Sequence, residues 1–265
     1  YALKYAVLPQ GPVTFFTNND SAYAAALDLS RLGVTVSAIV DVRRDISDFA
    51  KFLAGRAGAE LIAGQAIVGT EGVKALKSIS IRPFDAASGE ISGTARTIAC
   101  QTLGVSGGWS PAIQLASQAG GRPKWDARLQ AFLPPEPLPG FSFHAAGAAN
   151  GAGDLTQAFS EGHSVAAFLA KGLGKKAVKA LPVKIDLDTA DQAPAPVLEI
   201  APKDSKQKAF IDLQADVTAD DLRQAAQERP GQAGLWLCPS GMGESEIELP
   251  LLRLRAAARG FEGDV

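Results

Sequence analysis

The sequence predicts an α/β fold built around a parallel sheet, and three observations support this prediction. Apolar runs of strand length alternate with amphipathic segments of helix length, and turns rich in Gly, Asn or Pro separate them. Of the 265 residues, 46% are hydrophobic, which suffices for a sizeable core. Residues 13–41 read as strand, polar turn, helix and second strand, the order of a βαβ unit.

The elements expected in the first hundred residues have clear boundaries. Strands are β-branched or aromatic runs between turn residues, and helices end at glycines. Asp20 or Ser21 can cap the first helix through a side-chain oxygen. The expected strands cover 13–17, 34–40, 59–72, 73–85 and 95–108, and the expected helices cover 21–32 and 46–58.

Later elements are less regular. Pro111 favours the first turn of a helix, because no intrahelical N–H bond is lost there. The expected elements are a helix over 111–121, two short strands within 123–140, a buried strand over 141–147 and a long helix stopped by Gly172 and Gly174.

Composition and charge argue against several functions. The net charge is −2, so a nucleic-acid partner has no electrostatic support. No apolar run has the length of a membrane span and no secretion signal is recognisable, so we expect a cytoplasmic protein without membrane contact. The two cysteines, Cys100 and Cys238, give no disulfide framework. His144 and His163 have no nearby nucleophile or ligand-spaced partner, which favours structural roles.

The turn after the first strand lacks the glycines of a dinucleotide fingerprint. Those glycines permit a tight turn and the close approach of a pyrophosphate, but Thr17, Asn18 and Asn19 stand in their place. Asn tolerates left-handed backbone, so the turn can survive while side chains occupy the phosphate's space. Asp41 has the position of an acid that binds a ribose hydroxyl. The sequence favours a relic turn, folded but empty, in which Asp41 is a cap or is solvated.

Four segments, taken in order, resemble the α subunit of bacterial heterotetrameric sarcosine oxidase. They read FFTNNDSAYAAALDLSRLGVTVSAIVD, GVSGGWSPAIQLASQAGG, HAAGAANGAGDLTQAF and KAFIDLQADVTADDLRQA. The resemblance spans residues 13–228, and the TNND departure from glycine is part of it. More broadly, the order resembles the pyridine-nucleotide–disulfide oxidoreductases. It implies a Rossmann-like fold with two dinucleotide-binding domains, incomplete at its N-terminus.

The resemblance also implies a division of the chain into four parts. Residues 1–98 correspond to an inserted NAD(P)-type domain, and residues 99–174 to the C-terminal part of the first, FAD/NAD-type domain. Residues 175–207 are rich in Ala, Pro, Lys and Asp, as linkers are. Residues 208–265 resemble the start of a small iron–sulfur domain followed by an unplaced tail. Asp212 and Gln214 stand where cluster-binding cysteines would be, so no cluster is expected.

By the same resemblance, cofactor contacts fall at two strand exits. Ala148 stands where flavin reductases carry an Asp, which argues against a flavin contact there. The resemblance to the sarcosine oxidase α subunit implies NAD as the cofactor of the first domain, with flavin mainly in a partner subunit. A helix N-terminus after the second exit suits an anion, although an ordinary glycine-rich turn is equally consistent. The predicted cofactor-binding residues are Gly107, Gly108, Trp109, Gly147, Ala148, Asn150 and Gly151, and no catalytic or metal-ligating residue is predicted.

The resemblance implies the activity of a larger enzyme. That enzyme oxidises sarcosine to glycine, passes a one-carbon unit to tetrahydrofolate through a downstream domain, and forms hydrogen peroxide with β, γ and δ subunits. This segment is expected to hold a dinucleotide and to be inactive and flavin-free alone. Two alternatives stay open: a subunit of a related amine- or opine-oxidising flavoprotein, and a non-catalytic scaffold that binds partner subunits.

Overall fold

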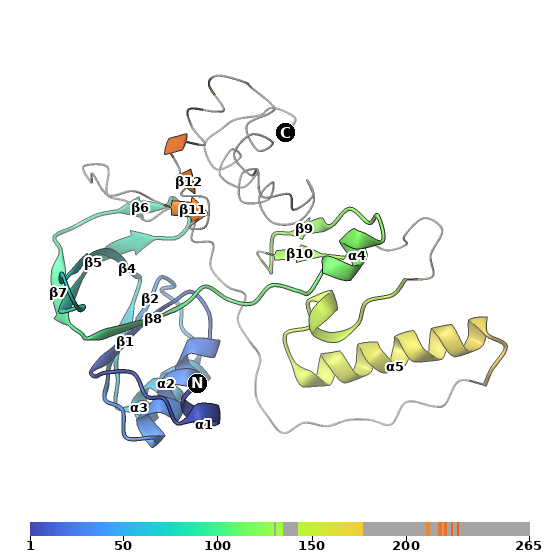
Figure 1. Ribbon diagram of the computed structural model, residues 1–265, viewed down its shortest axis with the longest axis horizontal. Coiled ribbons are helices and arrows are strands. Elements are labelled where there is room, and N and C mark those ends of the chain that lie inside the picture. The colour runs from blue at the N-terminus through green and yellow to red at the C-terminus, as the bar shows by residue number, and fades with distance from the viewer. Residues whose placement is uncertain are drawn as a thin grey trace. The chain divides into compact units, whose positions relative to one another are not determined.

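The first strand–turn–helix–strand segment folds as the sequence predicts. In the computed structural model, β1 (Val13–Thr17) is followed by α2 (Ser21–Arg31) and by β2 (Val36–Asp41), which pairs with β1 in parallel (Figure 1). A one-turn helix, α1 (Ala2–Tyr5), precedes them. The structure describes residues 1–129, 131–134, 143–176, 210–212, 217–218, 220–221, 224 and 227.

The described residues fall into two compact units. Unit 1 comprises Tyr1–Gly108, and the described residues from Trp109 onward belong to unit 2. Unit 1 contains a parallel sheet in the order β3-β2-β1-β8, with β3 at Glu60–Ala63 and β8 at Thr102–Ser106. This sheet confirms the predicted Rossmann-like α/β class.

The register aligns the carboxyl ends of the parallel strands. Thr17 is paired with Asp41 of β2 and with Ser106 of β8, and Asp41 is paired with Ala63 of β3. Each of these four residues is the last of its strand. In open α/β sheets this is the edge at which ligands bind, so the side chains at this edge form the candidate site.

Unit 1 has a second, antiparallel sheet. Strand β5 (Ser78–Asp85) pairs with β4 (Gln65–Glu71), β6 (Glu90–Ile91) and β7 (Arg96–Ala99). The single strands expected over 59–72 and 95–108 are each wrong, because each is divided between the two sheets. Gly64, with φ +67°, breaks the first, and the second breaks at Cys100–Gln101.

The parallel sheet is covered on both faces, so neighbouring residues of one strand enter different cores. Phe15 and Ile39 pack with α2 and with α3 (Asp48–Ala57). Val40 packs with Ile79 and Ile81 of the antiparallel sheet. Because β8 completes the parallel sheet, it belongs to unit 1, which extends to Gly108.

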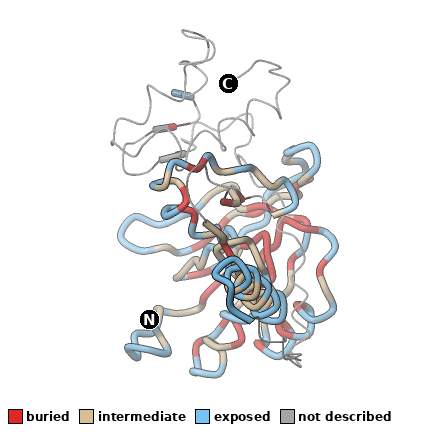
Figure 2. The backbone as a smooth tube through the Cα atoms, turned by 90° about the vertical axis from the view of Figure 1, so that its right-hand side faces the viewer, coloured by how far each residue is buried: buried red, intermediate tan, exposed pale blue. Residues whose placement is uncertain are grey.

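Unit 2 is less regular. The hairpin expected within 123–140 is present as β9 (Lys124–Asp126) and β10 (Ala131–Leu133), and the long helix α5 (Leu155–Gly172) ends before Gly174 as predicted. No residue of α5 is buried, and its tube is tan and pale blue in Figure 2. The elements are α4 (Gln114–Gln118), β9 (Lys124–Asp126), β10 (Ala131–Leu133), the 3-10 helix η1 (Gly147–Asn150), α5 (Leu155–Gly172), β11 (Phe210–Asp212) and β12 (Val217–Thr218).

Two expectations for unit 2 are wrong. The helix expected from Pro111 begins at Gln114. The strand expected over 141–147 is absent from its described residues, 143–147, because no neighbouring strand pairs with them and the backbone turns at Gly147, whose φ is +66°. Most of the expected linker, the tail beyond residue 227, Gln214 and Cys238 lie outside the described residues.

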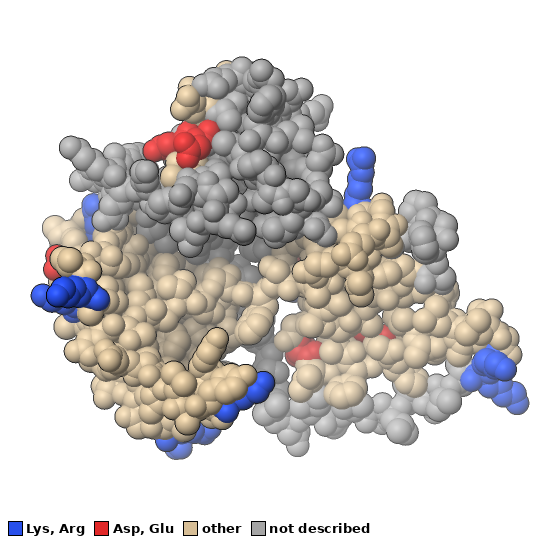
Figure 3. Space-filling model, in the orientation of Figure 1, with Lys and Arg blue, Asp and Glu red and all other residues tan. Residues whose placement is uncertain are grey.

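Surface charge and helix hydropathy add two observations about the described residues. On the face drawn in Figure 3, Lys and Arg side chains stand in separate groups rather than in one continuous patch. Among the helices that the structure describes, none combines the length and apolar character that a bilayer crossing requires.

Candidate functional site

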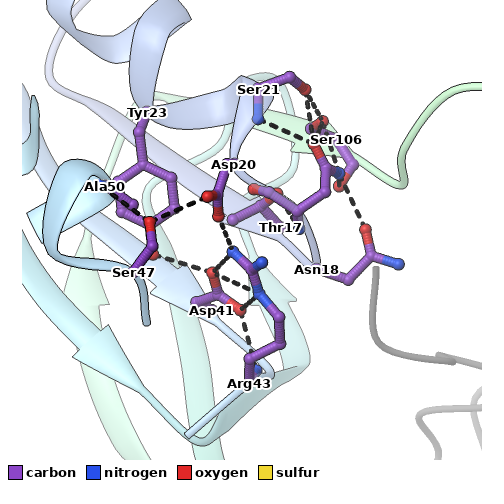
Figure 4. A network of polar contacts seen from close by, with 11 residues as sticks. Thr17, Asn18, Asp20, Ser21, Tyr23, Asp41, Arg43, Ser47, Ala50 and Ser106 are labelled. Carbon is purple, nitrogen blue, oxygen red and sulfur yellow. Dashed lines mark hydrogen bonds and ion pairs between the residues drawn. The ribbon is translucent and has the colours of Figure 1, made fainter. Parts of the chain in front are cut away.

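The carboxyl edge of the parallel sheet carries a cluster of buried polar side chains (Figure 4). Thr17 and Asp41, which are buried, and Ser106, which is half-buried, end their strands there, and the turn after β1 adds Asn18, Asn19 and Asp20. Both asparagines and Asp20 are buried. Because buried polar groups require partners, the cluster must satisfy itself or bind a ligand.

Asn19 satisfies one half of the cluster. Its Oδ1 accepts the backbone N–H of Ser21 at 3.0 Å, and its Nδ2 donates to the carbonyl and hydroxyl oxygens of Ser106, each at 3.1 Å. The Thr17 hydroxyl closes the turn, because it donates to the carbonyl of Asn19 at 2.9 Å and accepts the N–H of Asn19 at 3.1 Å. The turn that is glycine-rich in a dinucleotide-binding fingerprint is therefore stabilised here by side-chain hydrogen bonds.

Arg43 organises the other half. Its Nη2 lies 2.7 Å from Asp20 Oδ1 and 2.8 Å from Asp41 Oδ2, and its Nε also donates to Asp41. The hydroxyl of Tyr23 donates to Asp41 Oδ2 at 2.8 Å, and Ser47 Oγ donates to Asp20 Oδ2 at 3.0 Å. Residues from β1–α2, β2 and the start of α3 thus meet in one ion-pair network.

Burial makes this network electrostatically strong. Asp41 and Tyr23 are both 0% exposed. Burial, followed by the charge of Asp41 and the hydrogen bond to it, holds the pKa of Tyr23 far above its ordinary value. Burial would lower the pKa of the Arg43 guanidinium, but hydrogen bonds and charge from Asp41 and then Asp20 outweigh it and raise that pKa. The network keeps a neutral phenol and a charged guanidinium beside two carboxylates.

The structure corrects two expectations about this edge. Of the two roles expected for Asp41, the solvated one is wrong, because Asp41 lies fully buried between Tyr23 and Arg43; its Oδ1 accepts the backbone N–H of Arg43 at 2.8 Å, as a capping side chain does. Asp20 does occupy the N-cap position of α2, but its side chain makes no capping bond. Asn19 supplies that bond to Ser21. That the βαβ unit is folded is confirmed, and that it binds no nucleotide stays a prediction.

Sequence reasoning missed several members of the network. Tyr23, Ser47 and Ser106 were not recognised, and no local pattern marks them. The spacing Asp41–Val42–Arg43 was a usable signal, since alternate residues of an extended segment point to the same side.

The predicted cofactor-binding residues are divided between the units. Gly107 and Gly108 end unit 1, and Gly108 has φ +99°. Trp109 belongs to unit 2 and is 83% exposed. Gly147, Ala148, Asn150 and Gly151 lie together in η1 and at its C-cap.

The turn at η1 is hydrogen-bonded to α5, the helix that follows it in the chain. The N–H of Gly147 donates to Glu161 Oε2 at 3.0 Å, and Asn150 Nδ2 reaches the same oxygen at 3.4 Å. Asp154 caps α5 by accepting the N–H of Gln157 at 2.7 Å. An anionic oxygen therefore binds at each of these backbone donors, and both oxygens belong to the protein.

Potential metal ligands do not gather among the described residues, where no three His, Cys, Asp or Glu side chains are suitably grouped. Cys100 is buried, and burial, opposed by a contact with Thr14, raises the pKa of its thiol.

Comparison with known proteins gives one clear relationship. No protein-family model matches the chain. It is 34% identical over 228 residues to "Sarcosine oxidase subunit alpha" of Rhizobium meliloti (strain 1021), covering 86% of this chain and 21% of that protein. It is 29% identical over 228 residues to the protein of the same name from Corynebacterium sp. (strain P-1), covering 85% and 23%.

The chain is similar to sarcosine oxidase α subunits over most of its length. The resemblance inferred from the sequence is thereby confirmed. The chain spans about a fifth of the length of these relatives, at 21% and 23%.

Solved structures are more distant. Thioredoxin reductase of T. acidophilum is 14% identical with a TM-score of 0.47, covering 63% of this chain and 54% of that one. Thioredoxin reductase of Lactococcus lactis is 17% identical with a TM-score of 0.44, covering 62% and 53%. The fold class rests on the strand order described above.

Proposed function

We propose that this chain is part of the α subunit of a multi-subunit oxidoreductase that oxidises sarcosine to glycine. The observation that carries the proposal is the 34% identity to a sarcosine oxidase α subunit over 86% of the chain. The one-carbon product passes to tetrahydrofolate in a domain outside this chain, hydrogen peroxide is formed, and β, γ and δ subunits complete the enzyme. Flavin belongs mainly to a partner subunit.

Within that enzyme, we assign unit 1 a scaffold role. The phosphate position of a dinucleotide site is occupied by the side chains of Asn18 and Asn19, and the position of the ribose acid is taken by Asp41, which is bonded to Arg43. Asp20 adds a negative charge. A like charge at contact distance costs on the order of 1 kcal/mol even in high dielectric, and more when buried. These features disfavour a pyrophosphate at this edge.

The NAD cofactor of the intact subunit is assigned to unit 2 residues. Gly147 and Gly151 have φ +66° and +83°, and Ala148 between them is small. The backbone N–H of Gly147 already donates to the carboxylate of Glu161, so its chemistry suits an anionic oxygen. When bound, NAD would supply a redox-active dinucleotide. In this chain Gly147 and Ala148 would accommodate its phosphates, and Asn150 would offer a side-chain amide.

A nucleotide assay of the complete enzyme tests this assignment. We expect Gly147→Val to lower the NAD released on denaturation sharply, and Asn18→Ala to leave it unchanged. Gly58→Val is the matched control, because Gly58 has φ +72° in unit 1 and imposes the same backbone strain without touching η1. Equal loss in both Val variants, or loss in Asn18→Ala, contradicts the assignment to unit 2.

A second candidate is a scaffold that holds no nucleotide. It is favoured by one observation: protein carboxylates already occupy the backbone donors at η1 and at the start of α5. It predicts no NAD in the purified complete enzyme together with intact subunit assembly. Sarcosine-dependent peroxide formation separates the sarcosine oxidase proposal from a related amine- or opine-oxidising enzyme, which would turn over a different amine.

A further inference from the structure

Asn19 lies where three segments of unit 1 meet. It follows β1 and directly precedes the N-cap of α2, and its buried side chain reaches the end of β8, 87 residues away in the sequence. A buried amide is costly unless both of its ends are bonded. Both ends of Asn19 are bonded, and the partners come from different elements.

Two backbone groups fix the orientation of the Asn19 amide. The N–H of Ser21 can only donate, so it must face Oδ1, and the carbonyl of Ser106 can only accept, so it must face Nδ2. The oxygen end therefore receives the first free N–H of α2. Asp20 does not supply this bond, because its carboxylate is held by Arg43 and Ser47.

The nitrogen end holds a strand terminus that has few other supports. Among the described residues β8 pairs only with β1, so it is an edge strand, and Ser106 is its last residue. The next residue, Gly107, has open space where a Cβ would be, and Gly108 has φ +99°. Ser106 is held by the ladder with β1, by the two bonds from Asn19 Nδ2, and by a contact of 3.2 Å between its hydroxyl and that of Ser21.

We propose that Asn19 is an internal substitute for a ligand, whose amide oxygen binds the start of α2 while its amide nitrogen fixes the end of β8. The carboxyl edge of unit 1 is then ordered without a bound anion. This role concerns only unit 1 and does not depend on where, or whether, the complete protein binds NAD.

Hydrogen exchange of the full 265-residue chain tests the proposal. In Asn19→Ala we expect amides of residues 104–108 and of the first turn of α2 to exchange about tenfold faster, the effect of losing a hydrogen bond or two. Asn19→Asp is nearly isosteric and tests the oxygen end and the nitrogen end of the amide separately. It keeps an acceptor for Ser21 but places an oxygen against the carbonyl of Ser106, so only residues 104–108 should exchange faster.

Two further variants distinguish a specific role of Asn19 at the end of β8 from a general loss of stability of unit 1. Ser47→Ala removes the cap of α3 and one bond to Asp20 in the same unit, and should leave the exchange of residues 104–108 unchanged. Ser106→Ala removes only the hydroxyl contacts, leaves the bond to the carbonyl, and should give a smaller loosening of the same residues. The proposal is overturned if Asn19→Asp exchanges like the parent chain at residues 104–108, or if Ser47→Ala loosens these residues as much as Asn19→Ala does.

Discussion

The turn after β1 and the turn at η1 each lead into a helix with an Asp at its N-cap, yet the two acids do different things. Asp154 caps α5 through the N–H of Gln157. Asp20 leaves that task to Asn19 and pairs with Arg43. The difference arises because the guanidinium of Arg43, two residues after β2, lies within reach of Asp20, whereas among the described residues Asp154 accepts a bond from its own helix. The same residue in the same local position takes its role from what packs beside it.

Burial separates the two turns as well. Around the first, Asn19, Asp20, Asp41 and Arg43 are all buried, and their contacts connect elements far apart in the sequence. Around the second, no residue of η1 or α5 is buried, and the backbone N–H groups of Gly147 and Gln157 are bonded by carboxylates of α5 and of its N-cap. We therefore expect substitutions at the first turn to affect the stability of the whole unit and those at the second to act locally.

The largest expected effect comes from Arg43. Arg43→Met leaves Asp20 and Asp41 buried without a cation, and breaking a buried pair in this way costs about 3–5 kcal/mol of unfolding free energy. Urea unfolding followed by circular dichroism measures it. Arg44→Met is the control, because Arg44 is exposed and lies 3.7 Å from Asp85, so its loss should cost about 0–1 kcal/mol. Similar losses of unfolding free energy in the two variants would mean that the buried ion pairs stabilise the fold no more than an exposed pair does.

A smaller effect is expected for Tyr23→Phe. It removes the buried hydrogen bond to Asp41, which is worth about 1.5–3 kcal/mol because the acceptor is charged. The control Tyr5→Phe removes an exposed hydroxyl and should be nearly neutral. Urea unfolding at pH 7 compares the two. Equal stability of Tyr23→Phe and the parent chain would contradict the buried bond.

The raised pKa of Tyr23 gives this pair a pH dependence. The folded chain keeps the phenol protonated where an unfolded tyrosine, with a pKa of about 10, ionises. Its contribution is complete below about pH 10 and is lost as the pH rises above that value, with a slope approaching 1.4 kcal/mol per pH unit. Between about pH 10 and 11, the parent chain should therefore lose more stability than Tyr23→Phe. Parallel pH profiles of the two chains would refute this.

At the second turn, Gly151→Ala should cost about 1–2 kcal/mol, because an L side chain at φ +83° is strained. A Cβ there would also meet the methyl ends of Leu129 and Leu133 at 2.7 Å. Gly153→Ala, in open space at an ordinary φ, is the matched control and should change stability by less than about 0.5 kcal/mol. Thermal unfolding monitored by tryptophan fluorescence compares them, and indistinguishable curves would show that this turn tolerates rearrangement.

The smallest effect is expected for Asp154→Ala, which removes the cap of α5 at a cost of about 1 kcal/mol. Because the contact is local, faster hydrogen exchange should be confined to the first turn of the helix, around Gln157. Asp48→Ala, which loses an exposed pair with Lys51, serves as the control. Exchange that spreads through unit 2 would contradict a local role.

Local signals predicted much of unit 1. β1, α2, β2 and α3 were recognisable from apolar runs, capping residues and terminal glycines, and α3 ends at Gly58 with φ +72° as such a glycine implies. The strands over 59–72 and 95–108 were misread, because which sheet a strand joins depends on its pairing partners. The strand expected over 141–147 failed for the same reason, since β propensity alone supplies no neighbour.

The sequence predicted where the candidate site lies but not which side chains meet there. The TNND turn and Asp41 marked the carboxyl edge of the sheet, and the absence of glycine indicated altered phosphate binding. The partners were not predictable. Tyr23, Ser47 and Ser106 reach the edge only because α2, α3 and β8 pack where they do.

The sequence by itself determined the order β1, α2, β2 and α3, the glycine at which α3 ends and the glycine-free turn, since each depends on residues close together in the chain. It also carried the resemblance to sarcosine oxidase α subunits. Only the tertiary structure decided that Asp41 is buried, that Asp20 pairs with Arg43 instead of capping α2, and that Asn19 holds Ser106. The physical reason is that an ionised or polar side chain takes whichever partner lowers its desolvation cost most. That partner is fixed by strand register and by helix packing over long separations in sequence.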